Sequence, residues 1–398
     1  MRNYLPVLVL IIGIVILLRI SFFFTIVYFL VGLYVLSSLW TRRSVGHVAV
    51  ARSFQERAFT GDEVRVTLRV TNTGVLPVSW LEVRDTIPGQ LLASPFRPEV
   101  LSLGAHETWS REYSLRCRHR GYYLLGPCTL RSGDLLGMHQ VYATVDRADR
   151  LIVYPRVVPL HQLQLPEHSP LAALPTRYPL FEDPNRTMGV RAYQRGDSPR
   201  RIHWSASART GQLLVKQYQP AIARETLICL DMCEESYSVR RRYEAIELAV
   251  VTAASLANHV VVRQDLPAGL AVDAMDPLVE ARQRFVLLPR SERGHLMSLL
   301  EVLARVEPVD EYSLGDLVTR ATAELAWGST VVVVTGGANT RVVDTLLALK
   351  RGGLLVALVV VHPGESEQLV RRQAASIGIP VYHVWTERDL ETWLPRTA

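Results

Sequence analysis

Three patterns of hydrophobic and polar residues follow one another along the 398-residue chain. Residues 5–40 are almost continuously apolar. From residue 45 to residue 155, apolar and polar positions alternate, which is the pattern of strands with one buried face. From residue 226 onward, short apolar runs alternate with segments of helical periodicity. The chain therefore predicts a multidomain protein with a membrane segment, a β domain and an α/β domain.

The apolar start of the chain predicts a transmembrane helical hairpin over residues 1–44. A single span needs about 20 apolar residues. Residues 5–40 are too long for one such span and long enough for two short ones, with a turn near their single charge, Arg19. Mean hydropathy of the whole chain is +0.13, and this segment carries much of the excess.

Charges on both sides of the apolar segment predict its orientation. Arg2 precedes the segment, and Arg42 and Arg43 follow it. Because positive flanks favour the cytoplasmic side, we expect a two-pass protein of the cell membrane with its bulk in the cytoplasm. Two alternatives stay open. One is a cleaved signal peptide, although no small-residue cleavage motif follows the apolar run; the other is a single longer span, which would place the bulk outside.

The alternating region predicts an antiparallel β-sandwich over residues 45–155. Segments such as 63–74 and 107–117 alternate apolar with polar residues and are separated by turn signals that include Pro-Gly and Ser-Gly-Asp. Several short strands at roughly ten-residue spacing are typical of a sandwich, a scaffold that implies no chemistry. Residues 156–188 are proline-rich and weakly patterned, which favours a linker.

The remaining residues, 189–398, predict a signature segment followed by a doubly wound α/β domain. Continuous apolar runs of the kind buried in a parallel sheet occupy residues 226–231, 268–273, 330–336, 354–361 and 381–385. Segments with helical spacing lie between them. Gly352-Gly353 and Gly378 are placed where a glycine ends a helix.

Residues 189–218 hold six cations around one acid and one tryptophan. These are Arg191, Arg195, Arg200, Arg201, Arg209 and Lys216, with Asp197 and Trp204. One reading is a structural clasp in which Arg200 and Arg209 pair with Asp197 while Trp204 is buried. A second is a docking surface for a partner or anionic lipid. A third, nucleic-acid binding, lacks a recognised module. We expect a mixture, with Trp204 and Arg200 in the fold and Arg191, Arg195 and Arg201 solvated.

This segment resembles a family of bacterial membrane proteins that carry "domain of unknown function 58". The resemblance rests on Gly196-Asp197-x-x-Arg200-x-Ile202-x-Trp204, on Ser207-Ala208-Arg209, and on a second block from Arg120-Gly121-Tyr122 to Gly137. Ser198 departs from it, since the family often has a second aspartate there. The resemblance implies a C-terminal domain similar to von Willebrand factor A. It also implies association with MoxR-type AAA+ ATPases and transglutaminase-like membrane proteins, but no defined activity.

The metal site that such domains often carry is degenerate in this sequence. The usual ligands include an Asp-x-Ser-x-Ser motif after the first strand, whose oxygen atoms suit hard cations. Here Asp231 is followed by Cys233 and Glu235 at the two serine positions, and Gly336 stands where a later aspartate is expected. A thiol is a poor ligand for Mg²⁺. We therefore predict no metal and no cofactor, with a cation gathered by Asp231, Glu234 and Glu235 as the alternative.

Catalytic motifs are weak throughout the sequence. His203 beside Ser205 suggests a nucleophile, but sequence neighbours seldom face each other and no nucleophile elbow is present. We predict that the protein is not an enzyme but a membrane-anchored adaptor for a MoxR-type AAA+ ATPase or for envelope-complex subunits. The alternatives are a partner-dependent subunit of a cell-envelope enzyme and a structural scaffold.

Overall fold

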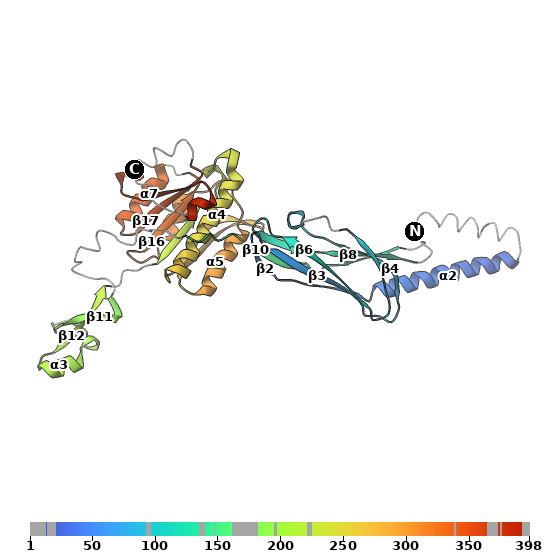
Figure 1. Ribbon diagram of the computed structural model, residues 1–398, viewed down its shortest axis with the longest axis horizontal. Coiled ribbons are helices and arrows are strands. Elements are labelled where there is room, and N and C mark those ends of the chain that lie inside the picture. Colours follow the sequence, from blue (N-terminus) through green and yellow to red (C-terminus); the bar gives the residue numbers. More distant parts are fainter. Residues whose placement is uncertain are drawn as a thin grey trace. The chain divides into compact units, whose positions relative to one another are not determined.

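The computed structural model describes residues 13, 21–92, 97–134, 140–146, 148–160, 182–194, 197–220, 225–337, 340–363, 373–374 and 376–391. The chain divides into two compact units, Met1–Arg156 and Val157–Ala398. It is a mixed α/β multidomain protein whose first unit is rich in β-structure and whose second combines strands and helices (Figure 1).

Helix α2, Ser21–Val45, is the described part of the apolar N-terminal segment. Its stretch Phe24–Val45 is long and apolar enough to cross a membrane, and only 11% of its most apolar window is buried. One other described helical stretch, Val239–Arg263, passes the same test but is 83% buried, as in the core of a soluble domain. Apart from Gly13, the first helix of the predicted hairpin lies outside the described residues, so two-pass topology stays a prediction.

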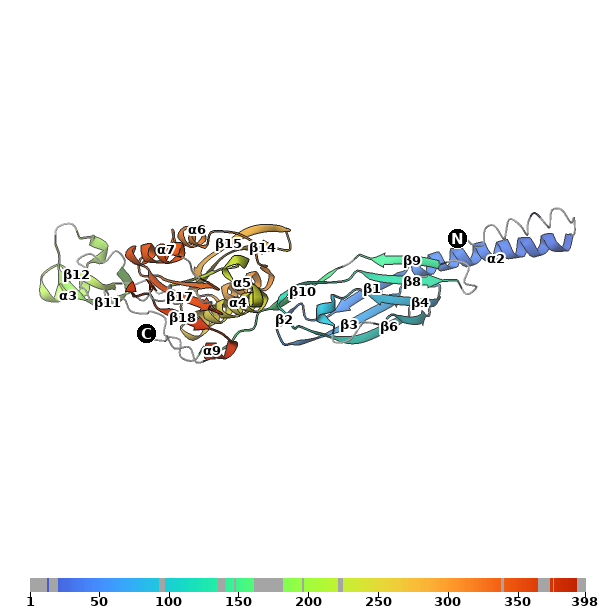
Figure 2. The ribbon, with the colours of Figure 1, turned by 90° about the horizontal axis from the view of Figure 1, so that it is seen from above.

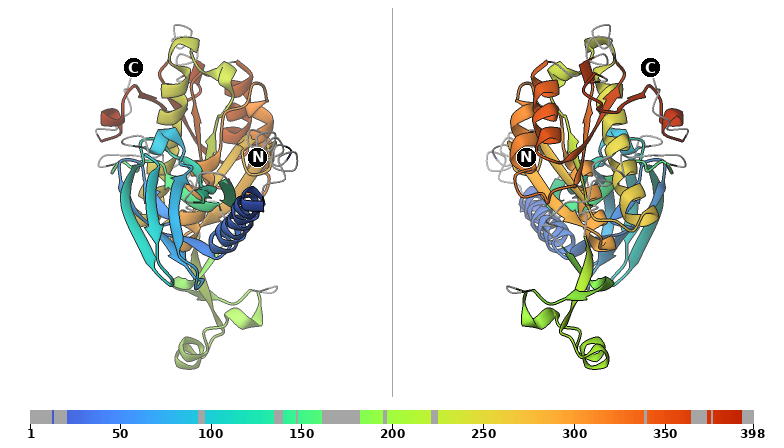
Figure 3. Two further views of the ribbon diagram at one scale, coloured as in Figure 1. Left: turned by 90° about the vertical axis from the view of Figure 1, so that its right-hand side faces the viewer. Right: turned by 90° about the vertical axis from the view of Figure 1, so that its left-hand side faces the viewer.

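Ten strands form the β domain of the first unit. They are β1 (Val48–Ser53), β2 (Arg57–Phe59), β3 (Glu63–Asn72), β4 (Val78–Asp85), β5 (Glu99–Leu103), β6 (Thr108–Arg116), β7 (Gly121–Leu125), β8 (Cys128–Gly133), β9 (Gln140–Val145) and β10 (Asp149–Tyr154). A short 3-10 helix, η1 (Gly89–Leu91), follows β4. The strands pair in the orders β1-β3-β6, β2-β10-β7 and β5-β4-β8-β9, with β10–β2 parallel and the other pairs antiparallel. Figure 3 shows the strands of this domain in blue to blue-green.

Alternation along β3 explains how these sheets pack. Val64 and Val66 join an apolar cluster with β7 and β10, whereas Leu68 and Val70 join a second cluster with β4 and β8. All four side chains are almost fully buried. The β1-β3-β6 sheet therefore packs against both of the others, because side chains of one face of a strand point to one side.

The six-stranded sheet of the second unit has the order β15-β14-β13-β16-β17-β18. Its strands are β13 (Thr226–Leu230), β14 (Ala268–Asp276), β15 (Ala281–Arg290), β16 (Thr330–Thr335), β17 (Leu355–Val361) and β18 (Val381–Val384). All neighbours are parallel except β14 and β15. Strand β15 was not expected from the sequence. It is an edge strand with alternating partial exposure, so it lacks the continuous apolar run of its neighbours.

Helices cover both faces of this sheet, as Figure 2 shows. They are α4 (Arg242–Asn258), α5 (Arg293–Arg305), α6 (Leu314–Ala321), α7 (Thr340–Arg351) and α9 (Glu387–Glu391), with the short elements η4 (Glu234–Ser236), η5 (Val239–Arg241) and η6 (His259–Arg263). Leu227 and Cys229 face the cluster formed by α6 and α7, while α4 packs on the other face of β13 and β16. Burial on both faces is the reason why β13 and β16 are apolar throughout.

A two-stranded sheet precedes this domain. It consists of β11 (Glu182–Ala192) and β12 (Leu214–Pro220), with η3 (Pro199–Arg201) and α3 (Trp204–Thr210) between them. Strand β11 begins inside the residues 156–188 that were assigned to the linker. It forms a strand because it pairs with β12. The local sequence pattern does not reveal this pairing.

Candidate functional site

The cations of the segment 189–218, called here the arginine module, are organised by one ion pair. Arg191 donates through both terminal nitrogens to the two carboxylate oxygens of Asp197, at 2.7 and 2.6 Å. Asp197 also accepts from the backbone amide of Gln194 at 2.8 Å. Hydrogen bonds from Arg191, followed by the one from Gln194, hold the pKa of Asp197 below its ordinary value. Asp197 therefore closes the turn that follows β11.

Helix α3 is fixed to β12 by side-chain capping. The imidazole Nδ1 of His203 accepts from the amide of Ala206 at 3.2 Å, and the hydroxyl of Ser207 accepts from the amide of Leu214 at 2.9 Å. Gly211 ends the helix with φ of 70°, which glycine adopts without strain. The helix is thus positioned by short-range polar contacts, and Ala208 and Arg209 on it are exposed.

Trp204 is exposed, and this corrects the expectation that it belongs to the buried fold. Its exposed fraction is 67%, the largest of any described tryptophan among the exposed apolar residues. It opens α3 directly after the capping residue His203, so its side chain starts at the exposed end of a short helix. Tyr193 and Leu213, which are linked by a backbone hydrogen bond of 2.8 Å, are also partly exposed.

The pairing expected within the arginine module is also corrected. Asp197 pairs with Arg191, which was expected to be solvated, and not with Arg209, which is exposed at the end of α3. Arg191 lies on the strand next to the turn, so it reaches the carboxylate with less loss of chain entropy than the helical Arg209. Arg201 is exposed and contributes to the field at Asp197, and Lys216 is half-buried on β12. Arg195 and the side chain of Arg200 lie outside the described residues.

A second candidate lies at the carboxyl ends of β13 and β16. In open α/β sheets, ligands bind where the order of strands reverses, and here that point falls between these two strands. Asp231 directly follows β13, and Thr335 ends β16. Asp231 is fully buried. This is the position at which the sequence predicts a degenerate metal site.

Protein donors surround the carboxyl group of Asp231. One oxygen accepts from the amide of Cys233 at 3.0 Å and from the phenol of Tyr312 at 2.8 Å. The other oxygen lies 2.7 Å from the hydroxyl of Thr335, which itself lies 2.8 Å from the carbonyl oxygen of Gly337. A hydroxyl has one proton and cannot donate to both acceptors. Both contacts become hydrogen bonds when Asp231 is protonated and donates to Thr335.

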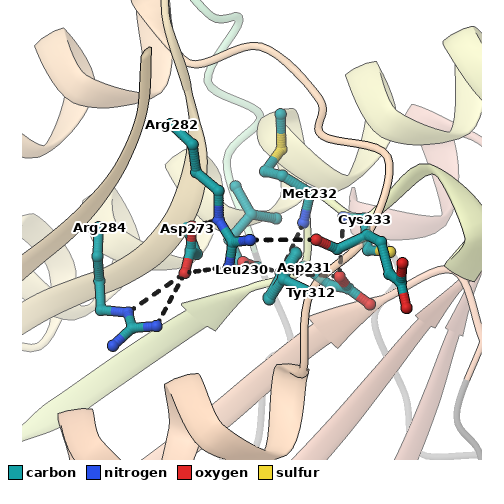
Figure 4. A network of polar contacts seen from close by, with 9 residues as sticks. Leu230, Asp231, Met232, Cys233, Asp273, Arg282, Arg284 and Tyr312 are labelled. Atoms are coloured by element: carbon teal, nitrogen blue, oxygen red, sulfur yellow. Dashed lines mark hydrogen bonds and ion pairs between the residues drawn. The ribbon is translucent and has the colours of Figure 1, made fainter.

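Burial raises the pKa of Asp231, and the surrounding neutral donors only partly oppose the shift. The pKa of the neighbouring acid in the sheet, Asp273, is shifted the other way. Asp273 lies on β14 beside Asp231, because Leu230 pairs with Val272. Although desolvation opposes it, hydrogen bonds from Arg282 and Arg284 lower the pKa of Asp273. Figure 4 shows the two acids with these arginines and Tyr312. The pKa values of these two adjacent acids are therefore shifted in opposite directions, by burial at Asp231 and by the arginines at Asp273.

A tyrosine fills the space above this edge of the sheet. Tyr237 is 3% exposed and donates to the backbone carbonyl of Asp231 at 2.6 Å. Its ring lies against Gly336, where a Cβ atom would come within 2.2 Å of the ring. Cys233 donates to the carbonyl of Asp310 at 3.4 Å, and Glu235 is exposed. Among the described residues, no three His, Cys, Asp or Glu side chains are grouped to hold a metal ion.

Contact between His203 and Ser205 differs from what was expected. The hydroxyl of Ser205 lies 3.1 Å from His203 Nδ1, so these near neighbours do face each other. The same nitrogen accepts from the amide of Ala206, and a helix cap brings the three residues together. The contact follows from the geometry of a first helical turn.

Several residues of this second site were missed by the sequence reasoning. Tyr237, Tyr312, Arg282 and Arg284 come from a loop, from a connection after α5 and from β15. Tyr312 lies 81 residues from Asp231 in sequence. No local motif marks them; the nearest signal is that both apolar runs 226–231 and 268–273 end in aspartate.

Part of the chain is similar to known proteins. Residues 189–369 match the model of a family described as "Protein of unknown function DUF58". The match begins at the arginine module and covers most of the described α/β domain. An uncharacterized protein, YeaD, of Bacillus subtilis (strain 168) is 24% identical over 319 residues, which are 77% of this chain and 74% of that protein. The chain is therefore similar to this family over its C-terminal part.

Likeness to solved structures is weak. A von Willebrand factor type A protein from Catenulispora acidiphila is 11% identical, with a TM-score of 0.29, over 45% of this chain and 42% of that one. The conserved hypothetical protein BatB from Bacteroides thetaiotaomicron is 18% identical, with a TM-score of 0.23, over 35% of this chain and 66% of that one. These scores are too low to transfer a detailed fold or a function.

Proposed function

We propose that this protein is a membrane-anchored adaptor that binds a protein partner through its arginine module. The observation that carries the proposal is the exposure of Trp204, 67% of whose surface is open in a segment with six cations and one acid. Tryptophan, tyrosine and arginine dominate the binding energy of protein interfaces. Since Arg191 neutralises Asp197, the remaining charge of the module is strongly positive.

The charge of the module defines the chemistry of the partner, which is a protein with an acidic surface. The family resemblance suggests a MoxR-type AAA+ ATPase, or another subunit of an envelope complex such as a transglutaminase-like membrane protein. An ATPase partner works where ATP is available, so the proposal includes a cytoplasmic position for the second unit. Apolar residues of α2 would hold the protein at the membrane.

An adaptor role also agrees with the surroundings of Asp231. The acid is fully buried, accepts from Cys233 and Tyr312, and is covered by Tyr237. A catalytic acid has to come within hydrogen-bond reach of its substrate, and Asp231 has no surface at which a substrate could do so. We therefore include in the proposal that the α/β domain acts by presenting a surface and not by catalysis.

Binding of a MoxR-type ATPase to the full chain in lipid nanodiscs tests the proposal. Trp204→Ala should weaken binding at least about tenfold, as expected for an interface hot spot, without lowering the thermal unfolding temperature. Arg209→Ala, a second exposed change on α3, should weaken binding at low salt, and this loss should shrink as salt screens the charge. Trp385→Ala is the matched control, because Trp385 is 46% exposed and lies outside the module. A Trp204→Ala protein that binds as well as wild type would overturn the proposal.

Binding of the arginine module to an anionic membrane is the alternative that the next measurement tests. The same variants are measured with vesicles that contain phosphatidylglycerol, in the absence of the ATPase. Loss of vesicle binding by Trp204→Ala, with no binding of the ATPase by the wild-type chain, would assign the module to a lipid surface. That result would reject the protein-partner proposal.

A further inference from the structure

The turn between β3 and β4 lies alongside the end of α2. At one end of the turn, the backbone amide of Thr73 donates to the carbonyl of His47 at 2.9 Å. At the other end, the indole of Trp40 donates to the carbonyl of Pro77 at 3.1 Å. Trp40 lies in the last two turns of α2, and His47 lies two residues beyond the end of the helix. The turn therefore runs back along α2 toward its apolar part.

This turn is held rigidly by a buried asparagine. Asn72 has no exposed surface, and its amide nitrogen donates to the carbonyl oxygens of Leu76 and Gly104 at 2.9 and 2.8 Å. Its side-chain oxygen accepts from the amide of Gly74 at 3.0 Å. A Cβ on Gly74 would lie 3.0 Å from the Cβ of His47, so a side chain has little room there. These contacts fix the path of the turn.

Val75, at the tip of this rigid turn, is exposed. Its exposed fraction is 74%. A single exposed valine is ordinary on a soluble protein, but this one adjoins a helix whose large apolar side chains are also exposed. Leu36 and Leu39 of α2 have exposed fractions of 64% and 61%. Trp40, one helical turn after Leu36, links this part of α2 to the turn through its hydrogen bond with Pro77.

Polar contacts mark the level at which α2 leaves the apolar layer. Ser37 donates to a carboxylate oxygen of Asp134 at 3.2 Å, and Trp40 donates to Pro77. Thr41, Ser44 and Val45 are buried against the β domain. Tryptophan prefers the membrane–water interface, and Arg42 and Arg43 follow it in the last turn of the helix. If α2 spans the bilayer, Val75 lies at the level of the lipid headgroups.

We propose that the β3–β4 turn is a second membrane contact, with Val75 inserted into the interfacial layer of the bilayer that α2 crosses. The inference rests on the membrane anchoring included in the proposed function. The occupant of the exposed apolar tip is the lipid surface itself, because the turn is hydrogen-bonded to Trp40 of the helix that would cross that surface. Two contacts, a helix and a rigid turn, hold the β domain in one orientation on the membrane.

Site-specific fluorescence in nanodiscs tests this contact on the full chain. Val75→Cys is labelled with an environment-sensitive nitrobenzoxadiazole probe; the four native cysteines, Cys117, Cys128, Cys229 and Cys233, are all buried. We expect blue-shifted emission, quenching by lipids with a nitroxide near the headgroup, and protection from aqueous iodide. Arg118→Cys is the control, because the nine residues of β6 place it about 30 Å away. That probe should be quenched by iodide only.

A probe in α2 separates the failure of this inference from the failure of the proposed anchoring. Leu30→Cys, at a partly exposed position of the helix, should be quenched by a nitroxide deep in the acyl chains. If Leu30→Cys is quenched while Val75→Cys behaves like Arg118→Cys, the turn is not a membrane contact and the anchor stands. If Leu30→Cys is not quenched by lipid, α2 does not span the bilayer, and both proposals fall.

Discussion

The ring of Tyr237 occupies the space that a side chain on Gly336 would need. A Cβ at position 336 would lie 2.2 Å from the ring, and Tyr237 also donates to the carbonyl of Asp231. This contact closes the edge of the sheet at the point where doubly wound domains usually bind a ligand. The α/β domain keeps the architecture of a binding fold while its own aromatic side chain fills the crevice.

Replacing Gly336 with alanine should destabilise the α/β domain. The added methyl group meets a buried ring, and overpacking of this kind costs about 1–3 kcal/mol. Urea denaturation of the full chain in detergent, followed by the fluorescence of its tryptophans, measures the loss. Gly294→Ala on α5 is the control, because nothing lies within 4 Å of the added atom. Equal stability of Gly336→Ala and wild type would show that Tyr237 can move out at no cost.

Asp231→Asn should change how stability depends on pH. Burial raises the folded pKa of Asp231 above its ordinary value of 3.8. Between those two values the folded state binds more protons than the unfolded state, so stability falls as pH rises through this window. An asparagine can donate to Thr335 and accept from Cys233 at every pH, and the variant should lack this loss. Unfolding curves across the acid to alkaline range measure it.

Asp273→Asn provides the opposite case. Since Arg282 and Arg284 lower the folded pKa of Asp273, its stabilisation is present above the ordinary pKa and is lost as pH falls through the folded value. Removing the charge leaves two arginines without their carboxylate partner, so the variant should be less stable at neutral pH. A variant as stable as wild type at neutral pH would contradict the assigned ion pairs.

Added magnesium should have no effect on the α/β domain. One oxygen of Asp231 accepts from the amide of Cys233, the other is hydrogen-bonded to Thr335, and the thiol of Cys233 donates to the carbonyl of Asp310. Calorimetric titration with millimolar Mg²⁺ should therefore be flat, and Mg²⁺ should not raise the unfolding temperature. A micromolar dissociation constant that Asp231→Ala abolishes would establish a metal site after all.

Loss of Arg191 should open the turn at the head of the arginine module. Arg191→Met removes both hydrogen bonds to Asp197 and returns the pKa of that acid toward 3.8. Hydrogen exchange, corrected for the intrinsic rate, should show weaker protection at the amide of Gln194. In wild type the protection should persist above the ordinary pKa and disappear as pH falls through the lowered one. Arg209→Met, on the exposed end of α3, should leave this amide unchanged.

Topology can be tested with reporters that are active only outside the cytoplasm. Because Arg2 and the pair Arg42 and Arg43 flank the apolar segment, fusions after residue 60 should be silent. A cytoplasmic reporter at the same site should be active. Activity of the external reporter there would exclude the hairpin and with it a cytoplasmic ATPase partner.

Much of the α/β domain can be predicted from the sequence because its central strands are buried on both faces. Such strands must be apolar at every position, as β13 and β16 are, and helices between them show their own period. Strand β15 could not be predicted in the same way. It lies at an edge of the sheet. Arg282 and Arg284, at exposed positions of this strand, form ion pairs with Asp273. The strand therefore mixes charged and apolar residues.

By itself, the sequence determined the apolar helix, the change from a β-rich region to an α/β region, and the concentration of cations around Asp197. Only the tertiary structure decided which of these residues meet. Arg191 rather than Arg209 pairs with Asp197, because the β11–β12 hairpin brings it there. Trp204 is exposed because α3 is anchored through His203 and Ser207. Tyr312 reaches Asp231 across 81 residues, since contacts between distant residues follow from packing and leave no local pattern in a chain.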